Sequence, residues 1–140
     1  MKQVPLKQVP PKQYTIPGKP VPLARPRFGS NRVYDCQKHL RNSAGIVLAN
    51  QHANAPLYTG PVLMRITFTF AIPKQTSKKN RERQRLSFHY KRPDLSNLIK
   101  FVEDVGHGIL WDDDCIISVI HAQKTYHDDA QTTFSIKPLE

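Results

Sequence analysis

The segment PVLMRITFTFAIP, residues 61–73, alternates apolar side chains with mostly polar ones along its whole length. A period of two places every second side chain on the same face of a β-strand. We therefore predict a strand with one buried face, which needs a sheet and a second layer packed against it. The side chains expected on the buried face are Val62, Met64, Ile66, Phe68, Phe70 and Ile72.

Two segments have the apolar spacing of helices that would form this second layer. The first is predicted to run to about His52, with Asp35 as its N-cap and with Cys36, Leu40, Val47 and Leu48 at near-helical spacing. The second is predicted from an Asp94 cap to about Val105, where Gly106 and Gly108 end it. Its apolar stripe consists of Leu95, Leu98, Val102 and Val105.

Three shorter stretches complete the expected sheet. We predict strands around Tyr14 to Ile16, over residues 115–126 and over residues 132–138, with a turn at residues 127–131. The order of elements indicates an α/β (α+β) fold, with a small mixed β-sheet packed against two helices. A chain of 140 residues is long enough for one such domain, which we place at residues 13–140.

The N-terminal segment differs from the rest in composition. Residues 1–12 contain the near-repeat KQVPL KQVPP, which favours an extended conformation outside the fold. It has no apolar core of a secretory signal, and no stretch of the chain is apolar for long enough to span a membrane. Cys36 and Cys115 do not form a disulfide or zinc pattern. The expectation is a cytoplasmic protein.

The chain carries a formal net charge of +10, which makes a polyanion the first partner to consider. Residues 74–92 hold eight Lys or Arg without an amphipathic period, so we predict a mobile basic loop. A second loop, punctuated by Pro and Gly, carries Arg25, Arg27 and Arg32. The basic loop is either a solvated connector or a flap that holds phosphates, in which an aromatic side chain stacks on exposed bases.

Negative charge is concentrated between positions 94 and 114, where six of the eleven acidic residues lie and Lys100 is the single cation: Asp94, Glu103, Asp104, Asp112, Asp113 and Asp114. Gathered carboxylates repel one another unless a cation lies among them. Mg²⁺ prefers such oxygen ligands and can activate a water for phosphodiester hydrolysis. If this helix and the next strand pack antiparallel, the helix start at Asp94 and the aspartates before the strand can reach the same end of the sheet.

Structural roles compete with this interpretation. An Asp at a helix start is usually a cap, and a run of three Asp is usually a solvated turn. Lys100 and Asp104 are one helical turn apart and are suited to a surface ion pair. Trp111 is expected to be a packing anchor for the acidic turn rather than a platform for a base.

Residues 93–124 resemble the RusA-type Holliday-junction resolvases of bacteria and their phages, in which a helix opens with D-L-D-N-L-x-K and W-x-D-D precedes a strand that ends in lysine. The likeness extends loosely over residues 14–137. The matching positions are Asp94, Leu95, Asn97, Leu98, Lys100, Asp104, Gly108, Trp111, Asp113, Asp114, Ile117 and Lys124.

The resemblance implies a homodimer that binds four-way DNA junctions and nicks them symmetrically with Mg²⁺ or Mn²⁺. By position, Asp94 and Asp114 match metal-binding aspartates, and the adjacent acid Asp113 is counted with them as a candidate metal ligand. Lys100 matches an essential lysine that would neutralise charge on the scissile phosphate. The role of Asp104 in this pattern is open between function and structure. A phage or bacterial cytoplasmic enzyme is the expectation.

One position departs from the family pattern, because Ser96 stands where the second helical aspartate is expected. A hydroxyl can bind Mg²⁺ but adds no charge. Either Asp112, Asp113 or Glu103 compensates and the enzyme cuts DNA, or the protein is a weakened or inactive relative that only binds branched DNA. We retain Ser96 among the candidate catalytic residues.

Candidate DNA contacts are drawn from the basic segments and from the lysine of the strand after the aspartates. Replacing them is expected to lower affinity by degrees rather than to remove the chemistry. They are Arg25, Arg27, Lys74, Lys78, Lys79, Arg81, Arg83, Arg85, Lys91, Arg92 and Lys124.

Overall fold

The computed structural model describes residues 11–24, 27–29, 32–34 and 36–139. Its main sheet has four strands in the order β1-β6-β4-β5, where β1 is Lys12–Pro17, β4 is Val62–Ala71, β5 is Ile117–His127 and β6 is Gln131–Pro138. β6 pairs antiparallel with both β1 and β4, whereas β4 and β5 are parallel. The predicted mixed sheet is confirmed.

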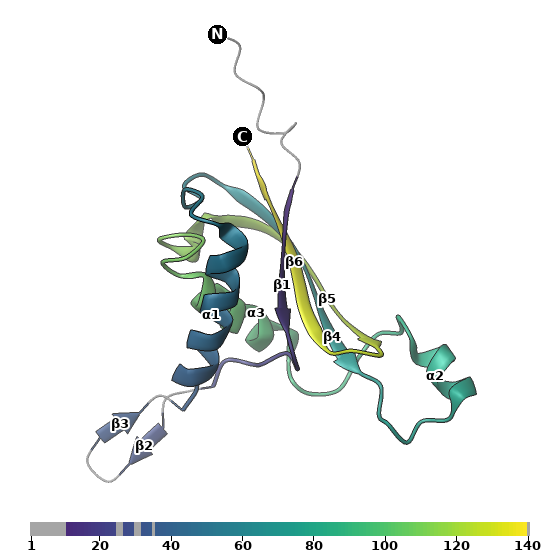
Figure 1. Ribbon diagram of the computed structural model, residues 1–140. Coiled ribbons are helices and arrows are strands. Elements are labelled where there is room, and N and C mark those ends of the chain that lie inside the picture. The colour runs from purple at the N-terminus through teal and green to yellow at the C-terminus, as the bar shows by residue number, and fades with distance from the viewer. Residues whose placement is uncertain (1–10, 25–26, 30–31, 35, 140) are drawn as a thin grey trace, which may run out of the picture.

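Two helices cover one face of this sheet (Figure 1). They are α1, Lys38–His52, and α3, Leu95–Gly106. α3 lies in the connection between β4 and β5, since parallel neighbours need a long crossover that packs against the sheet. None of the helices in the described ranges is long and apolar enough to cross a membrane.

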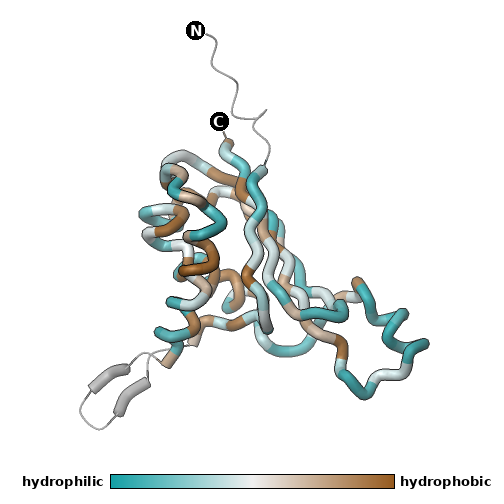
Figure 2. The backbone as a smooth tube through the Cα atoms, in the orientation of Figure 1, coloured by the Kyte–Doolittle hydropathy of each residue, from teal (hydrophilic) through white to brown (hydrophobic). Residues whose placement is uncertain are grey.

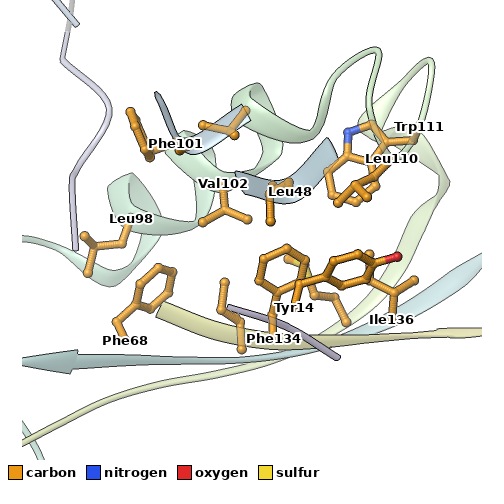
Figure 3. Close-up of a cluster of buried hydrophobic side chains, with 14 of the residues drawn as sticks. Tyr14, Leu48, Phe68, Leu98, Phe101, Val102, Leu110, Trp111, Phe134 and Ile136 are labelled. Carbon is orange, nitrogen blue, oxygen red and sulfur yellow. The ribbon is translucent and has the colours of Figure 1, made fainter. Parts of the chain in front are cut away.

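The core lies between these helices and the alternating face of β4 (Figure 3). All six side chains predicted to face inward from residues 62–72 are buried. From α3, Leu98, Phe101, Val102 and Val105 are buried as well, which confirms the predicted stripe and adds Phe101 to it. The tube coloured by hydropathy shows hydrophobic and hydrophilic residues alternating along both the helices and the strands (Figure 2).

The start of α1 differs from the prediction. Gln37 is the N-cap residue and Lys38 the first helical residue, while Asp35 lies outside the described residues. Gln37 is buried, and its side-chain amide bonds the backbone of Pro22 and Ala24. Cys36 precedes the helix and is exposed, and Leu40 is 45% exposed, so neither belongs to the core.

Two segments expected to be loops contain regular structure. Arg27–Gly29 and Arg32–Tyr34 form a small antiparallel hairpin, β2 and β3, within the loop predicted to carry Arg25 and Arg27. Arg25 itself lies outside the described residues. At the N-terminus, β1 begins at Lys12, the last residue assigned to the tail, and residues 1–10 also lie outside the described ranges.

The basic segment 74–92 contains a helix, α2, at Lys78–Gln84, so the prediction of an irregular loop was wrong. Ser77 caps α2 by accepting a hydrogen bond from the backbone N–H of Asn80. No α2 residue is buried. The helix therefore has no apolar stripe for a sequence pattern to detect, and it depends on polar tertiary contacts instead.

Candidate functional site

The acidic turn before β5 is built around Trp111, which is fully buried. Its indole N–H donates to the carbonyl of Glu103 at 3.3 Å, and its ring lies so close to Gly106 that a Cβ there would come within 2.5 Å of it. This confirms Trp111 as a packing anchor. Because the turn is fixed to the last part of α3, the aspartates that follow Trp111 are held beside that helix.

Asp114 lies against α3 in a small cleft. The cleft has a volume of about 220 Å³ and is lined by Leu23, Lys100, Glu103, Asp104, His107 and Asp114. Lys100 and Glu103 are three residues apart, which places them on one face of α3, and His107 follows as the C-cap residue of this helix. The structure thus brings together two predicted site residues, Lys100 and Asp114, with Glu103.

Glu103 and Asp114 form a carboxyl pair. Burial, together with a hydrogen bond and charge repulsion from Asp114, raises the pKa of Glu103 to about 7, and Lys100 opposes this shift. Repulsion from the neighbouring carboxylate disfavours the charged form of Glu103. A divalent cation would remove the same repulsion, so the donor set suits a hard metal ion.

Asp113 has a different position from its neighbour. Its carboxylate accepts a hydrogen bond from the backbone N–H of Cys115 at 2.9 Å and so caps the 3-10 turn η2, Asp114–Ile116. The same bond lowers the pKa of Asp113. Asp112 and Asp113 do not line the cleft. Asp113 thus holds the turn that presents Asp114.

Asp94 is the N-cap residue of α3, but its side chain makes no capping hydrogen bond. The capping alternative therefore does not explain this carboxylate. Asp94 does not line the cleft that contains Asp114, so the structure does not bring these two predicted metal ligands together there. Nine residues separate Asp94 from Glu103, or about 14 Å along the helix axis. Lys100 lies between them, and Ser96 is exposed near the Asp94 end.

No group of three or more His, Cys, Asp or Glu side chains in the described part of the chain is arranged to hold one metal ion. Mg²⁺ is usually held by one or two carboxylates together with substrate phosphates. The Glu103–Asp114 pair offers this number of carboxylates. The expected surface pair between Lys100 and Asp104 is replaced by an ion pair of Asp104 with Arg41 on α1, at 3.1 Å.

Lys124 has a structural contact that the sequence did not reveal. Its ammonium donates to the carbonyls of Lys91 and Pro93, at 2.6 and 2.7 Å. The backbone N–H of His89 also donates to the Lys124 carbonyl. β5 therefore holds the segment that leads directly into Asp94.

If the chain cuts DNA junctions as the resemblance implies, Lys124→Met should reduce single-turnover cleavage about tenfold, because the segment before Asp94 loses both hydrogen bonds. Junction affinity and its salt dependence should stay close to those of the unmodified protein. Filter binding between 50 and 300 mM NaCl checks this point. If Lys124 instead contacted a phosphate, the slope of log K against log salt would fall by about one.

The basic segment 74–92 projects from the body of the molecule and carries α2 (Figure 1). We call this segment the basic arm. Arg81 and Arg85 form ion pairs with Asp128 at 3.4 and 3.1 Å, and Leu86 donates its backbone N–H to the carbonyl of Tyr126. The arm is therefore attached to β5 and to the turn that follows it. Apart from the ion-paired Arg85, its exposed cations are Lys74, Lys78, Lys79, Arg83, Lys91 and Arg92.

The last part of the basic arm exposes three large apolar side chains. Leu86 is 74%, Phe88 69% and Tyr90 88% exposed. His89, between the aromatic residues, is buried and stacks on Phe70 with ring centroids 4.0 Å apart. The alternation leaves Phe88 and Tyr90 presented to solvent beside the exposed cations of the arm.

The fold and the cleft define an α+β protein in which a lysine and a glutamate of α3 lie beside an aspartate of the following turn. The basic arm belongs to the same connection between β4 and β5 as α3. Residues 17–137 match the model of a protein family that is described as "Endodeoxyribonuclease RusA". The chain belongs to the RusA endodeoxyribonuclease family, which confirms the resemblance seen in the sequence. It is also 28% identical over 139 residues to the uncharacterized protein YqaN of Bacillus subtilis (strain 168), covering 91% of this chain and 96% of that relative.

Proposed function

We propose that this protein is a divalent-metal-dependent endodeoxyribonuclease that binds four-way DNA junctions and resolves them in recombination and repair. The observation that carries the proposal is the cleft in which Asp114, Glu103 and Lys100 meet. The ammonium group of Lys100 suits a phosphodiester, and the two carboxylates beside it suit a metal ion. Family membership supports DNA as the substrate.

In this mechanism Lys100 binds the scissile phosphate and balances the charge that develops on its oxygens. Asp114 binds Mg²⁺, for which Mn²⁺ substitutes, and Asp113 keeps Asp114 in place through the η2 cap. The metal ion supplies Lewis acidity and a water of lowered pKa.

Symmetric resolution of a junction needs two cuts, so we propose that a homodimer with two equivalent sites performs it. Sedimentation velocity on the free protein and on its junction complex measures the stoichiometry. Two chains per junction are expected. One chain per junction under cleavage conditions would contradict the dimer.

The decisive experiment incubates the protein with a synthetic four-way junction and with matched linear duplex, in Mg²⁺, in Mn²⁺ and in EDTA. Paired nicks in opposite strands are expected with either metal and none in EDTA. An absence of nicks with both metals at high protein concentration would overturn the proposed activity.

Ser96 favours a second candidate, a branched-DNA-binding protein without efficient cleavage. A serine in place of a carboxylate weakens the negative potential that would hold a metal ion. This candidate predicts junction binding that is insensitive to Asp114→Asn, with no cleavage to lose. The two functions are separated by the nicking assay on the unmodified protein.

DNA binding through the basic arm predicts a specific salt effect. Replacing Lys78, Lys79 and Arg83 with glutamine should reduce the slope of log K against log salt by about 2.7, since each phosphate contact contributes about 0.9. These cations are exposed and α2 is held by Arg81 and Arg85, so the fold is retained. Fluorescence anisotropy with a labelled junction measures the slope.

The matched control for the basic arm is Glu82→Gln, which removes an opposite charge from the same helix. It should leave the salt slope unchanged or raise it. A triple variant whose slope equals that of the unmodified protein would show that the basic arm does not contact phosphates. The cleavage rate at saturating protein should change little, because the cleft is untouched.

A further inference from the structure

One face of α3 carries both Ser96, which stands where the family has an aspartate, and Glu103, which lines the cleft. Ser96, Lys100 and Glu103 follow the i, i+4, i+7 spacing of a single helix face. Ser96 replaces a carboxylate at one end of this row, and Glu103 adds a carboxylate at the other end. Lys100 lies between them, so its ammonium retains an acidic partner on the face that it occupies.

The sequence offers three acidic residues that could compensate for the carboxylate missing at Ser96, and the structure places them differently. Asp112 is exposed and does not line the cleft. Asp113 does not line it either, and its carboxylate is engaged with the backbone of Cys115. Glu103 lines the cleft and is close enough to Asp114 to share a hydrogen bond with it.

The placement of Glu103 is fixed by its surroundings. Its carbonyl accepts the hydrogen bond from the buried Trp111, so the backbone of α3 at this point is tied to the acidic turn. Side chains on a helix lean toward its N-terminus, which directs the Glu103 carboxylate back toward Lys100. The oxygens of Glu103 and Asp114 thus lie together from two different elements, α3 and η2.

We propose that Glu103 supplies the carboxylate that Ser96 lacks, so that Glu103 and Asp114 together bind the divalent ion. This inference rests on the proposed nuclease function and names a metal ligand for it. Two carboxylates and the DNA phosphate make up the small ligand set that Mg²⁺ uses in sites of this kind. The site keeps the same number of carboxylates, but one of them lies at Glu103, about two helical turns after Ser96.

Binding of Mn²⁺ to the full chain without DNA, measured by electron paramagnetic resonance of the free ion, tests the inference independently of activity. Glu103→Gln keeps the size of the side chain and should weaken Mn²⁺ binding at least about tenfold. Adding Ser96→Asp to that variant should recover most of the affinity, because the row again carries one carboxylate, as in the unmodified protein. Ser96→Asp alone should bind Mn²⁺ more tightly than the unmodified protein.

Asp112→Asn is the matched control, since it removes one charge from the same acidic region without reaching the cleft. It should keep Mn²⁺ affinity within about threefold. Thermal melts confirm that each variant is folded, and Glu103→Asp, which keeps the charge on a shorter side chain, should show an intermediate affinity.

Unchanged Mn²⁺ affinity in Glu103→Gln, or a larger loss in Asp112→Asn, would overturn the role of Glu103. If the unmodified protein still nicks junctions in that case, the nuclease function stands and only this ligand is wrong. If the unmodified protein neither binds Mn²⁺ nor nicks DNA, both the inference and the nuclease function fail.

Discussion

Asp114→Asn is expected to lower kcat/KM for junction cleavage about a thousandfold while leaving junction affinity within about twofold. The amide has nearly the same size, but it removes the negative charge that holds the metal ion beside Lys100. A thousandfold loss corresponds to about 4 kcal/mol of transition-state stabilisation. Single-turnover rates on a labelled junction, with affinity measured in parallel, give both quantities.

Asp112→Asn is the control for Asp114, because it alters the same turn without reaching the cleft. Its cleavage rate should stay within about threefold of the unmodified protein. Equal losses in the two variants would indicate that the acidic turn acts through its total charge, and the assignment of Asp114 as a metal ligand would be wrong.

Lys100→Met should reduce the single-turnover rate at saturating protein about a hundredfold, which is the scale of losing one charged group that stabilises a transition state. Methionine keeps most of the aliphatic side chain, so the packing of α3 is preserved while the ammonium is lost. Lys100→Arg should recover part of the rate, since it restores the charge with a different geometry.

The control for Lys100 is Lys79→Met on α2, which removes an exposed cation of the basic arm. It should weaken junction binding without changing the rate at saturation. A Lys100→Met variant that loses affinity but keeps its saturated rate would reassign Lys100 as a DNA contact with no part in the chemical step.

The sheet and the helix that carry the cleft were predictable because their signals are local. The alternation in residues 62–72 and the stripe on α3 report which side of each element is apolar, and burial follows from that directly. The motif around Asp94, Lys100 and Asp114 was also visible, since its spacing belongs to a family whose model matches the chain.

The small elements were not predictable in the same way. α2 has no buried side chain, and it is attached through Asp128, a residue more than forty positions later in the chain. The cap of α1 was misassigned because Gln37 bonds the distant backbone of Pro22 and Ala24, which no helix-capping rule describes. Ion pairs and hydrogen bonds of this kind join residues whose distance in sequence carries no periodic signal.

The sequence alone determined the apolar faces, the order of the main elements and the family, because periodicity and motif spacing are properties of neighbouring residues. The tertiary structure decided which acidic residue accompanies Asp114. It excluded Asp112 and Asp113 from the cleft, added Glu103 and turned Lys124 toward the backbone before Asp94. The packing of Trp111 against the last part of α3 is the physical reason, since it holds the acidic turn beside Glu103.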